Sequence, residues 1–343
     1  MSGLEEPRAN PWLVGHVGVE AELCEAMRSG RLHHAWLLSG PAGVGKATLA
    51  FRFARRLLAG GVPAEGSLAL PEKHPTFRRV AAGWHADLLT IEREWDEKRK
   101  RLRGEIVVDN VREIAGFLHL TPAEGGWRVV IVDGAENLNR SAENALLKLL
   151  EEPPPRAVVV LACSAAGRLL PTIRSRCRRL RLDPLAADDM AAVLARALPA
   201  QSAAQRQAVI AAAEGSPGRA LQLADGEAVQ AAGLVAGIVK RMPALTAEDA
   251  FATADALGRS EESWSTFMDL LRATLSRAVR DAARERADAA QRGLLGARPL
   301  AGWVDVWQAL SELQRETEDL YLDRRQALLD SFALIADGVA DGV

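Results

Sequence analysis

The stretch Gly40-Pro41-Ala42-Gly43-Val44-Gly45-Lys46-Ala47-Thr48 determines what the rest of the chain can be. It has the G-x-x-x-x-G-K spacing of a phosphate-binding loop. An apolar strand-like run (35–38) precedes it and a helical pattern follows it, which is the context this motif requires. Glycines let backbone N–H groups surround phosphates, and the helix N-terminus adds positive charge. We predict a nucleotide site formed by Gly40, Gly43, Val44, Gly45, Lys46, Ala47 and Thr48. A glycine-rich turn with a solvated lysine is the alternative.

Position 47 departs from the usual motif. A hydroxyl normally stands there and ligates the Mg²⁺ that accompanies the nucleotide, whereas this chain has Ala47. Thr48 follows about 100° further around the helix and points elsewhere. We therefore expect weak binding of ATP or ADP, with Lys46 reaching the outer phosphates and Mg²⁺ binding in doubt.

The bulk composition restricts the class of protein. At 343 residues the chain is long enough for two or three domains, and its net charge of −2 gives no general attraction to nucleic acid. No run of about 18 apolar residues predicts a membrane span, and the acidic N-terminus does not resemble a signal peptide. Three scattered cysteines indicate reduced thiols in a cytoplasmic protein without a cysteine zinc site.

Apolar runs predict four strands, at 35–38, 88–91, 127–133 and 157–163, separated by helices. This alternation predicts an α/β fold with a parallel sheet, right-handed crossovers and the ligand at the carboxyl ends of the strands. Asp133 ends an aliphatic strand in the Walker B pattern, and Ser164 follows the next strand. We expect both to line the nucleotide site.

Other segments give weaker predictions. Residues 61–87 look irregular, and a helix over 110–120 would have Asp109 or Asn110 as its N-cap. The basic segment 98–103 could contact a phosphate backbone or form a solvated charged hairpin. Beyond residue 183 only helices are expected, and a tight turn at 215–219 presents Arg219 at a helix start.

Three segments together resemble the bacterial clamp-loader ATPases of the AAA+ class. They are the phosphate loop with His33-His34-Ala35-Trp36 before it, the run 144–154 ending in Glu151-Glu152-Pro153-Pro154, and Ser175-Arg176-Cys177. The turn at 215–219 is similar to the family's sensor-2 region, and 321–326 to its C-terminal helix. The resemblance extends over essentially the whole chain.

The resemblance implies three domains and a place in an assembly. An AAA+ P-loop NTPase domain with a parallel sheet (1–182) would be followed by a small helical lid domain (183–226) and an all-helical collar domain (227–343). Five such subunits form a hetero-pentameric ring that loads a sliding clamp onto primer-template DNA, with no membrane contact. Arg176 would be an arginine finger acting on a neighbouring subunit's ATP. The alternative is that Arg174, Arg176, Arg178, Arg179 and Arg181 form a solvated basic edge.

Two departures favour a non-motor member of this family. Motor subunits have a Glu directly after the Walker B Asp, where this chain has Gly134, and a four-cysteine zinc module that is missing between residues 61 and 127. We therefore expect little or no ATP hydrolysis by this chain and no zinc. An ATP-hydrolysing motor subunit of the same assembly and an unrelated P-loop kinase for a small molecule remain the alternatives.

Overall fold

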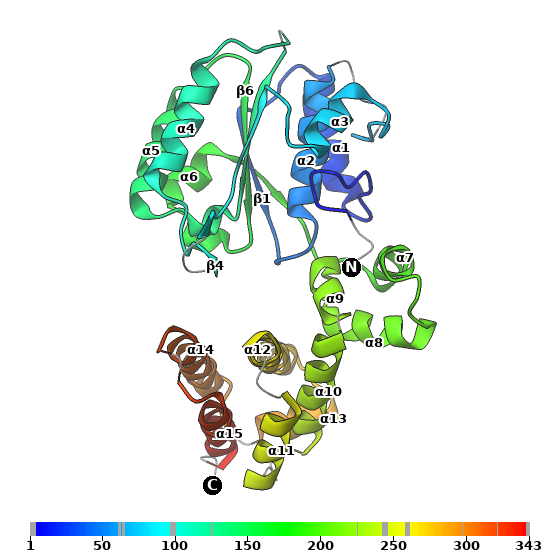
Figure 1. The fold of residues 1–343 in the computed structure, drawn as a ribbon, viewed down its shortest axis with the longest axis vertical. Coiled ribbons are helices and arrows are strands. Elements are labelled where there is room, and N and C mark those ends of the chain that lie inside the picture. The colour runs from blue at the N-terminus through cyan, green and yellow to red at the C-terminus, as the bar shows by residue number, and fades with distance from the viewer. Residues whose placement is uncertain are drawn as a thin grey trace. The chain divides into compact units, whose positions relative to one another are not determined.

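The chain divides into two units, residues 1–221 and 222–343 (Figure 1). The computed structural model describes residues 5–60, 63, 66–96, 101–124, 126–224, 226–241, 246–257, 261–296, 298–320 and 322–340. The predicted boundary between lid and collar, at 226, lies close to the boundary between the units. The separate lid domain, 183–226, stays a prediction.

Five strands of the first unit form a parallel sheet in the order β2-β5-β6-β1-β7. Their bounds are β1 Ala35–Ser39, β2 Leu88–Ile91, β5 Arg128–Asp133, β6 Ala157–Cys163 and β7 Arg178–Arg181. Counted among themselves from one to five along the chain, these strands have the order 5-1-4-3-2 across the sheet. The predicted α/β fold with a parallel sheet is confirmed.

Alternate residues of the strands pack into two different cores. Leu37 and Val130 lie in one hydrophobic cluster, and their neighbours Trp36 and Ile131 lie in the other. Side chains on a strand point to opposite faces in turn, so a strand covered on both faces must be apolar throughout. This explains why β5 and β6 are nearly continuous aliphatic runs.

Helices cover both faces of the sheet (Figure 1). On one side α4, α5 and α6 supply Ile114, Leu146 and Ile173 to the first cluster, and on the other α1 and α2 supply Leu23 and Phe53 to the second. The bounds are α1 Val17–Arg28, α2 Lys46–Leu58, α3 Pro75–Ala81, α4 Val108–His119, α5 Arg140–Glu151, α6 Pro171–Arg176, α7 Ala187–Ala197, α8 Ala203–Ala213 and α9 Pro217–Leu223, with short 3₁₀ turns η1 Ala135–Asn137 and η2 Ala166–Arg168.

Three local predictions were wrong. The segment predicted to be irregular contains α3, whose N-cap is His74. Helix α4 begins at Val108 with Val107 as N-cap, and Asn110 reaches back to accept the Val107 N–H at 3.0 Å. Strand β7 was not predicted because only Leu180 of its four residues is buried, so an edge strand rich in arginine lacks the apolar signal.

A short antiparallel hairpin follows β2. Strand β3 (Trp95–Asp96) pairs with β4 (Arg101–Leu102). Residues 98–100 of the predicted basic segment lie outside the described residues. Its last residue, Arg103, makes an ion pair with Glu94 at 2.9 Å, as the hairpin interpretation expects.

The second unit is built from helices. They are α10 Gly226–Arg241, α11 Ala247–Leu257, α12 Glu261–Ala283, α13 Ala289–Leu295, α14 Gly302–Leu320 and α15 Arg324–Ala340. Its interior includes the aromatic residues Trp264, Phe267, Trp303 and Phe332, with Phe267 and Phe332 in an edge-to-face contact at 6.5 Å. None of the described helices, in either unit, combines the length and apolar character needed to cross a membrane.

Candidate nucleotide site

The phosphate loop connects the end of β1 to the start of α2. Gly43 and Gly45 have φ values of 72° and 109°, which residues with a side chain rarely adopt. Gly45 is the N-cap of α2, so the helix N-terminus opens directly onto the loop. Ala47 and Thr48 lie half-buried in the first turn of α2. This is the strand, loop and helix arrangement that the sequence predicted.

Lys46 is 7% exposed and bonds to its own loop. Its Nζ donates to the carbonyls of Gly40 at 2.9 Å and Pro41 at 2.6 Å. Burial lowers the pKa of Lys46, and the carboxylates of Glu136 and Asp133 oppose that shift. The Lys46 ammonium is therefore held at the loop by carbonyl oxygens that a phosphate could replace.

Residues at and just before the start of α9 contact the phosphate loop. Ser216 Oγ donates to the Ala42 carbonyl at 2.8 Å, and the Gly218 N–H donates to the Gly43 carbonyl at 2.9 Å. A Cβ on Gly218 would lie 2.7 Å from Gly43 Cα, so the two backbones touch only because both residues are glycine. Arg219, the predicted sensor-2 residue, is therefore at the loop, where it pairs with Glu214 at 3.7 Å.

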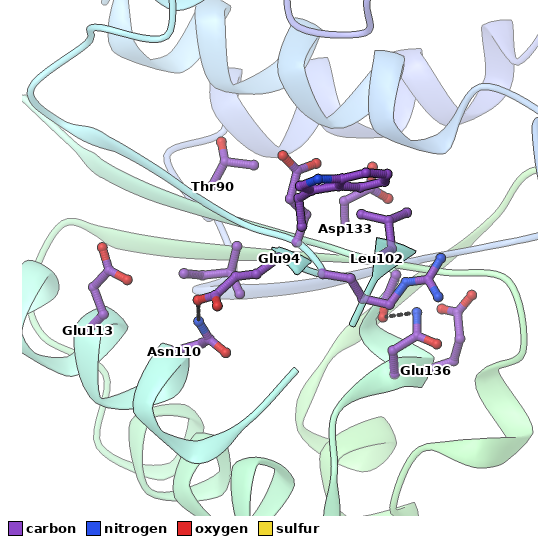
Figure 2. A pocket seen from close by; sticks show the side chains of 13 residues that line it. Thr90, Glu94, Leu102, Asn110, Glu113, Asp133 and Glu136 are labelled. Carbon is purple, nitrogen blue, oxygen red and sulfur yellow. Dashed lines mark hydrogen bonds between the residues drawn. The ribbon is translucent and has the colours of Figure 1, made fainter. Parts of the chain in front are cut away.

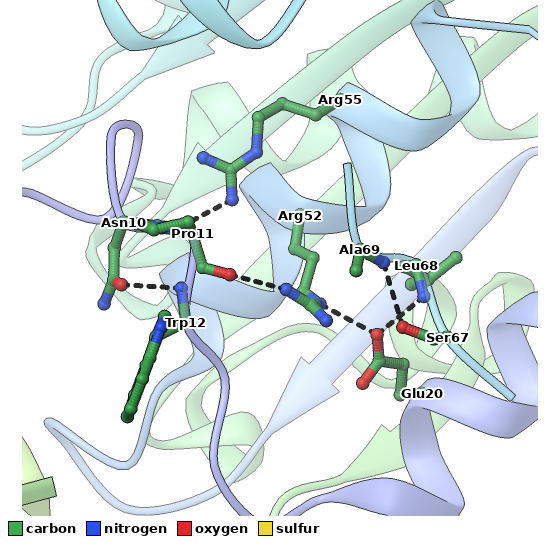
Figure 3. Close-up of polar contacts among 9 residues, drawn as sticks. All are labelled: Asn10, Pro11, Trp12, Glu20, Arg52, Arg55, Ser67, Leu68 and Ala69. Atoms are coloured by element: carbon green, nitrogen blue, oxygen red, sulfur yellow. Dashed lines mark hydrogen bonds and ion pairs between the residues drawn. The ribbon is translucent and has the colours of Figure 1, made fainter. Parts of the chain in front are cut away.

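His16 contacts the loop from the segment before α1, a neighbour that the sequence analysis missed. Its Nε2 lies 3.0 Å from the Val44 carbonyl, which makes Nε2 the protonated nitrogen. Further along the segment, the Trp12 ring stacks on the guanidinium of Arg196, in α7, at 3.7 Å. Arg52 and Arg55 of α2 fix the same segment, as Figure 3 shows. The only local sequence signal was the Asn10-Pro11 turn.

Taken together, these contacts leave the loop suited to phosphate. The carbonyls of successive loop residues accept hydrogen bonds from Lys46, Ser216, Gly218 and His16. All of these contacts use oxygens, so they do not compete with a phosphate for the N–H groups of the loop. The residues present therefore fit a nucleotide's phosphates.

The strand ends supply the acidic side of the site. Asp133 ends β5, and burial raises the pKa of its carboxyl, with Glu92 adding to the shift. Glu136, in η1, accepts the backbone N–H of Ser164 at 3.0 Å, so it joins the ends of β5 and β6. No local pattern in the sequence predicted this contact of Glu136. Because Ala47 lacks the hydroxyl that usually ligates Mg²⁺ at this position, the fit to Mg²⁺ is poor.

Gly134 lies where a motor subunit would have its glutamate. Its φ is 74°, and a Cβ there would lie 2.8 Å from Asn137 Nδ2. A glutamate could not be accommodated without strain. The backbone at Gly134 therefore disfavours any side chain at this position.

A cavity of about 650 Å³ opens beside Asp133 and Gly134 (Figure 2). It lies between the end of β2, the hairpin and α4, and no residue of the phosphate loop lines it. Most of its charged lining residues are acidic, namely Glu92, Glu94, Glu113, Asp133 and Glu136, and one, Arg93, is basic. Carboxylates repel phosphates, so this cavity does not suit that part of a nucleotide.

Arg176 is not among the residues that gather at the loop. It is the last residue of α6, and its guanidinium pairs with Glu151 at the end of α5 at 2.7 Å. Two neighbours on the basic edge are also paired, Arg178 with Glu22 and Arg181 with Asp183. Of the predicted site residues, Arg176 alone therefore belongs to a different surface feature.

The sequence matches a family described as DNA polymerase III, delta subunit, over residues 16–186. It is 39% identical over 208 residues to DNA polymerase III subunit delta' of Pseudomonas aeruginosa, which covers 60% of this chain and 61% of that protein. It is 34% identical over 219 residues to DNA polymerase III subunit tau of Escherichia coli. That match covers 62% of this chain and 32% of the tau subunit. The chain thus spans less than two thirds of the length of these relatives.

Solved structures give a weaker likeness. A DNA polymerase III gamma subunit-related protein of Thermotoga maritima aligns at 17% identity with a TM-score of 0.39, covering 92% of this chain and 99% of that one. The RuvB Holliday junction branch migration motor of the same organism aligns at 15% identity with a TM-score of 0.44. The alignment covers 96% of this chain and 92% of that one. By its sequence matches, the chain belongs to the family of DNA polymerase III clamp-loader subunits.

Proposed function

We propose that this chain is a delta-prime-like subunit of a DNA polymerase III clamp loader. In this role it joins other subunits in a hetero-pentameric ring and helps to load the sliding clamp onto primer-template DNA during replication. The 39% identity to a delta' subunit supports this assignment. The tau and gamma relatives, at 34% identity and below, support the assembly in general and a motor role less well.

The observation that carries the non-motor role is the backbone at Gly134. With φ at 74°, which residues with a side chain rarely adopt, the position after the Walker B Asp is unsuited to a glutamate. A general base typically contributes a factor of about 10² to 10⁴ to a rate. We therefore propose that this chain hydrolyses ATP weakly or not at all.

Weak nucleotide binding is compatible with that role. Gly43, Gly45 and Lys46 would hold the phosphates, and Arg219 would approach them from the α9 turn. Lys46→Ala should weaken the binding of a fluorescent ATP or ADP analogue to the isolated chain by about tenfold. Equal affinity of the variant and the parent would mean that the loop is vestigial.

Arg176 is the residue through which the chain would act on a neighbour. A guanidinium keeps its charge at all physiological pH values, and its fork of N–H groups matches phosphate oxygens. Arginine fingers contribute roughly 10³ to 10⁵ to related phosphoryl transfers. Since Arg176 lies on α6 and bonds to α5 rather than to its own phosphate loop, its contribution would be made in trans.

Two measurements separate the candidate functions. Size-exclusion chromatography with the cognate partner subunits should give a five-subunit complex, which a small-molecule kinase would not form. An ATPase assay on the isolated chain should show no turnover above background. Assembly together with substantial turnover by the isolated chain would instead identify a motor subunit.

A further inference from the structure

Two groups of its own chain hold the Arg176 side chain. Nη2 lies 2.7 Å from Glu151 Oε1, and Nη1 donates to the Thr172 carbonyl at 3.1 Å. Thr172 belongs to the same helix, α6, whereas Glu151 is the last residue of α5. The guanidinium is thus fixed between two helices.

The positions of both partners follow from the local sequence. Leu146 and Leu150 are buried and fix α5 against the sheet, and the two prolines after Glu152 stop the helix so that Glu151 stands at its end. Helix α6 is anchored to α5 by the fully buried Ile173 and by Glu143, whose Oε1 accepts the Leu170 N–H at 2.8 Å. The distance between Glu151 and Arg176 is therefore set by the core.

We propose that Glu151 is a positioning residue for Arg176. It holds the guanidinium in one orientation at the surface before a neighbouring subunit's nucleotide arrives, and it does not itself contact that nucleotide. This inference rests on the proposed role of Arg176 as an arginine finger. Orienting a long side chain in advance lowers the entropy lost when it binds.

The geometry indicates that Glu151 orients the Arg176 guanidinium and does not block it from binding a phosphate. The Arg176 and Glu151 side chains are 36% and 49% exposed, so the paired guanidinium remains accessible to a ligand at the surface. A guanidinium has five N–H donors, and the two contacts use two of them. Arg176 can therefore bind phosphate oxygens while it stays bonded to Glu151.

A double-mutant cycle tests the proposal. Complexes with the cognate partner subunits would carry the parent chain, Glu151→Ala, Arg176→Ala or both changes, and their ATP turnover on clamp and primed DNA would be compared. Glu151→Ala should lower turnover about threefold to tenfold, the effect of freeing one long side chain. In the Arg176→Ala background it should have no further effect, because it acts only through that arginine.

A neighbouring glutamate provides the matched control. Glu152 is exposed and follows Glu151 directly. Glu152→Ala therefore removes one carboxylate at the next position but leaves the ion pair between Glu151 and Arg176 intact. It should leave turnover at the parent value. In the isolated chain, Glu151→Ala but not Glu152→Ala should raise the reactivity of Arg176 toward phenylglyoxal, measured by peptide mapping.

The outcomes distinguish this inference from the function on which it rests. If Arg176→Ala complexes turn over ATP at the parent rate, the arginine-finger role itself fails. If Arg176→Ala lowers turnover but Glu151→Ala leaves it unchanged or raises it, only the positioning role is overturned. An equal loss from Glu151→Ala with and without Arg176 would show a merely structural role and would also overturn it.

Discussion

Gly134 separates this chain from an ATP-hydrolysing relative at a single backbone position. Because its φ is 74°, a conformation that residues with a side chain rarely adopt, a side chain there is strained. Gly134→Glu should lower the free energy of unfolding by about 1–3 kcal/mol without creating ATPase activity. The control is Gly104→Glu, at an exposed position with open space. Urea denaturation and an ATPase assay check both, and an active, fully stable Gly134→Glu chain would contradict the prediction.

His85 makes the stability of the first unit sensitive to acid. It is buried, its Nδ1 accepts the Asp87 N–H at 3.2 Å, and burial lowers its pKa, with smaller opposing effects from Glu124 and Asp87. As the pH falls, His85 is therefore protonated in the unfolded chain before it is protonated in the folded chain. The stability that neutral His85 contributes is fully present above the ordinary histidine pKa of about 6.5. It is lost as the pH falls toward the lower pKa that His85 has in the folded chain.

Replacing His85 should therefore flatten the pH dependence of stability. His85→Gln is expected to reduce the fall in the free energy of unfolding between pH 7 and pH 5, measured by urea denaturation at several pH values. His119→Gln, at an exposed position, is the control and should keep the parent slope. An unchanged slope in His85→Gln would assign the acid sensitivity to other groups.

The segment before α1 is attached to α2 by the buried Arg55 and the partly buried Arg52 (Figure 3). Arg55 is 1% exposed, donates to the carbonyls of Arg8 at 2.9 Å and Asn10 at 2.7 Å, and stacks on Phe77. Arg52 donates to the Pro11 carbonyl at 2.7 Å. Because this segment leads on to His16 at the phosphate loop, α2 positions one wall of the candidate site.

Removing one of these arginines should release the segment locally. Arg55→Met is expected to raise hydrogen exchange at residues 8–12 by about tenfold, as the loss of charged hydrogen bonds predicts. The strands β5 and β6 should keep the parent protection. Arg31→Met, on an exposed arginine, should change neither region. Equal exchange in Arg55→Met and the parent at residues 8–12 would refute the attachment.

The sequence predicted the elements whose signal is local. The aliphatic runs of β5 and β6 and the glycine loop before α2 were recognisable because burial on two faces and phosphate binding each require a distinctive residue pattern. Strand β7 and helix α3 were missed, since an arginine-rich edge strand and a seven-residue helix that begins at a proline lack such a pattern. The contacts of Ser216 and His16 with the loop join residues far apart in sequence, which no local pattern reveals.

The two units of the chain have separate hydrophobic interiors, and we propose that they have separate tasks. The first contains the candidate nucleotide site and Arg176, and the second is helical with apolar residues such as Val304 and Leu320 exposed. A chain ending at Gly226 should remain folded, as judged by a cooperative thermal transition, but should fail to join a ring with the partner subunits. Normal assembly of the truncated chain would show that the collar role of residues 227–343 is wrong.

The central claim is that this chain contributes to ATP hydrolysis through a neighbour's site and not through its own. The most direct test is the single-turnover rate of ATP hydrolysis in the reconstituted clamp loader, compared between Arg176→Ala and Lys46→Ala chains. Arg176→Ala should lower the rate at the neighbouring site by about 10³-fold or more, whereas Lys46→Ala should leave it close to the parent value. A parent-like rate with Arg176→Ala and a large loss with Lys46→Ala would contradict the account and identify a motor subunit.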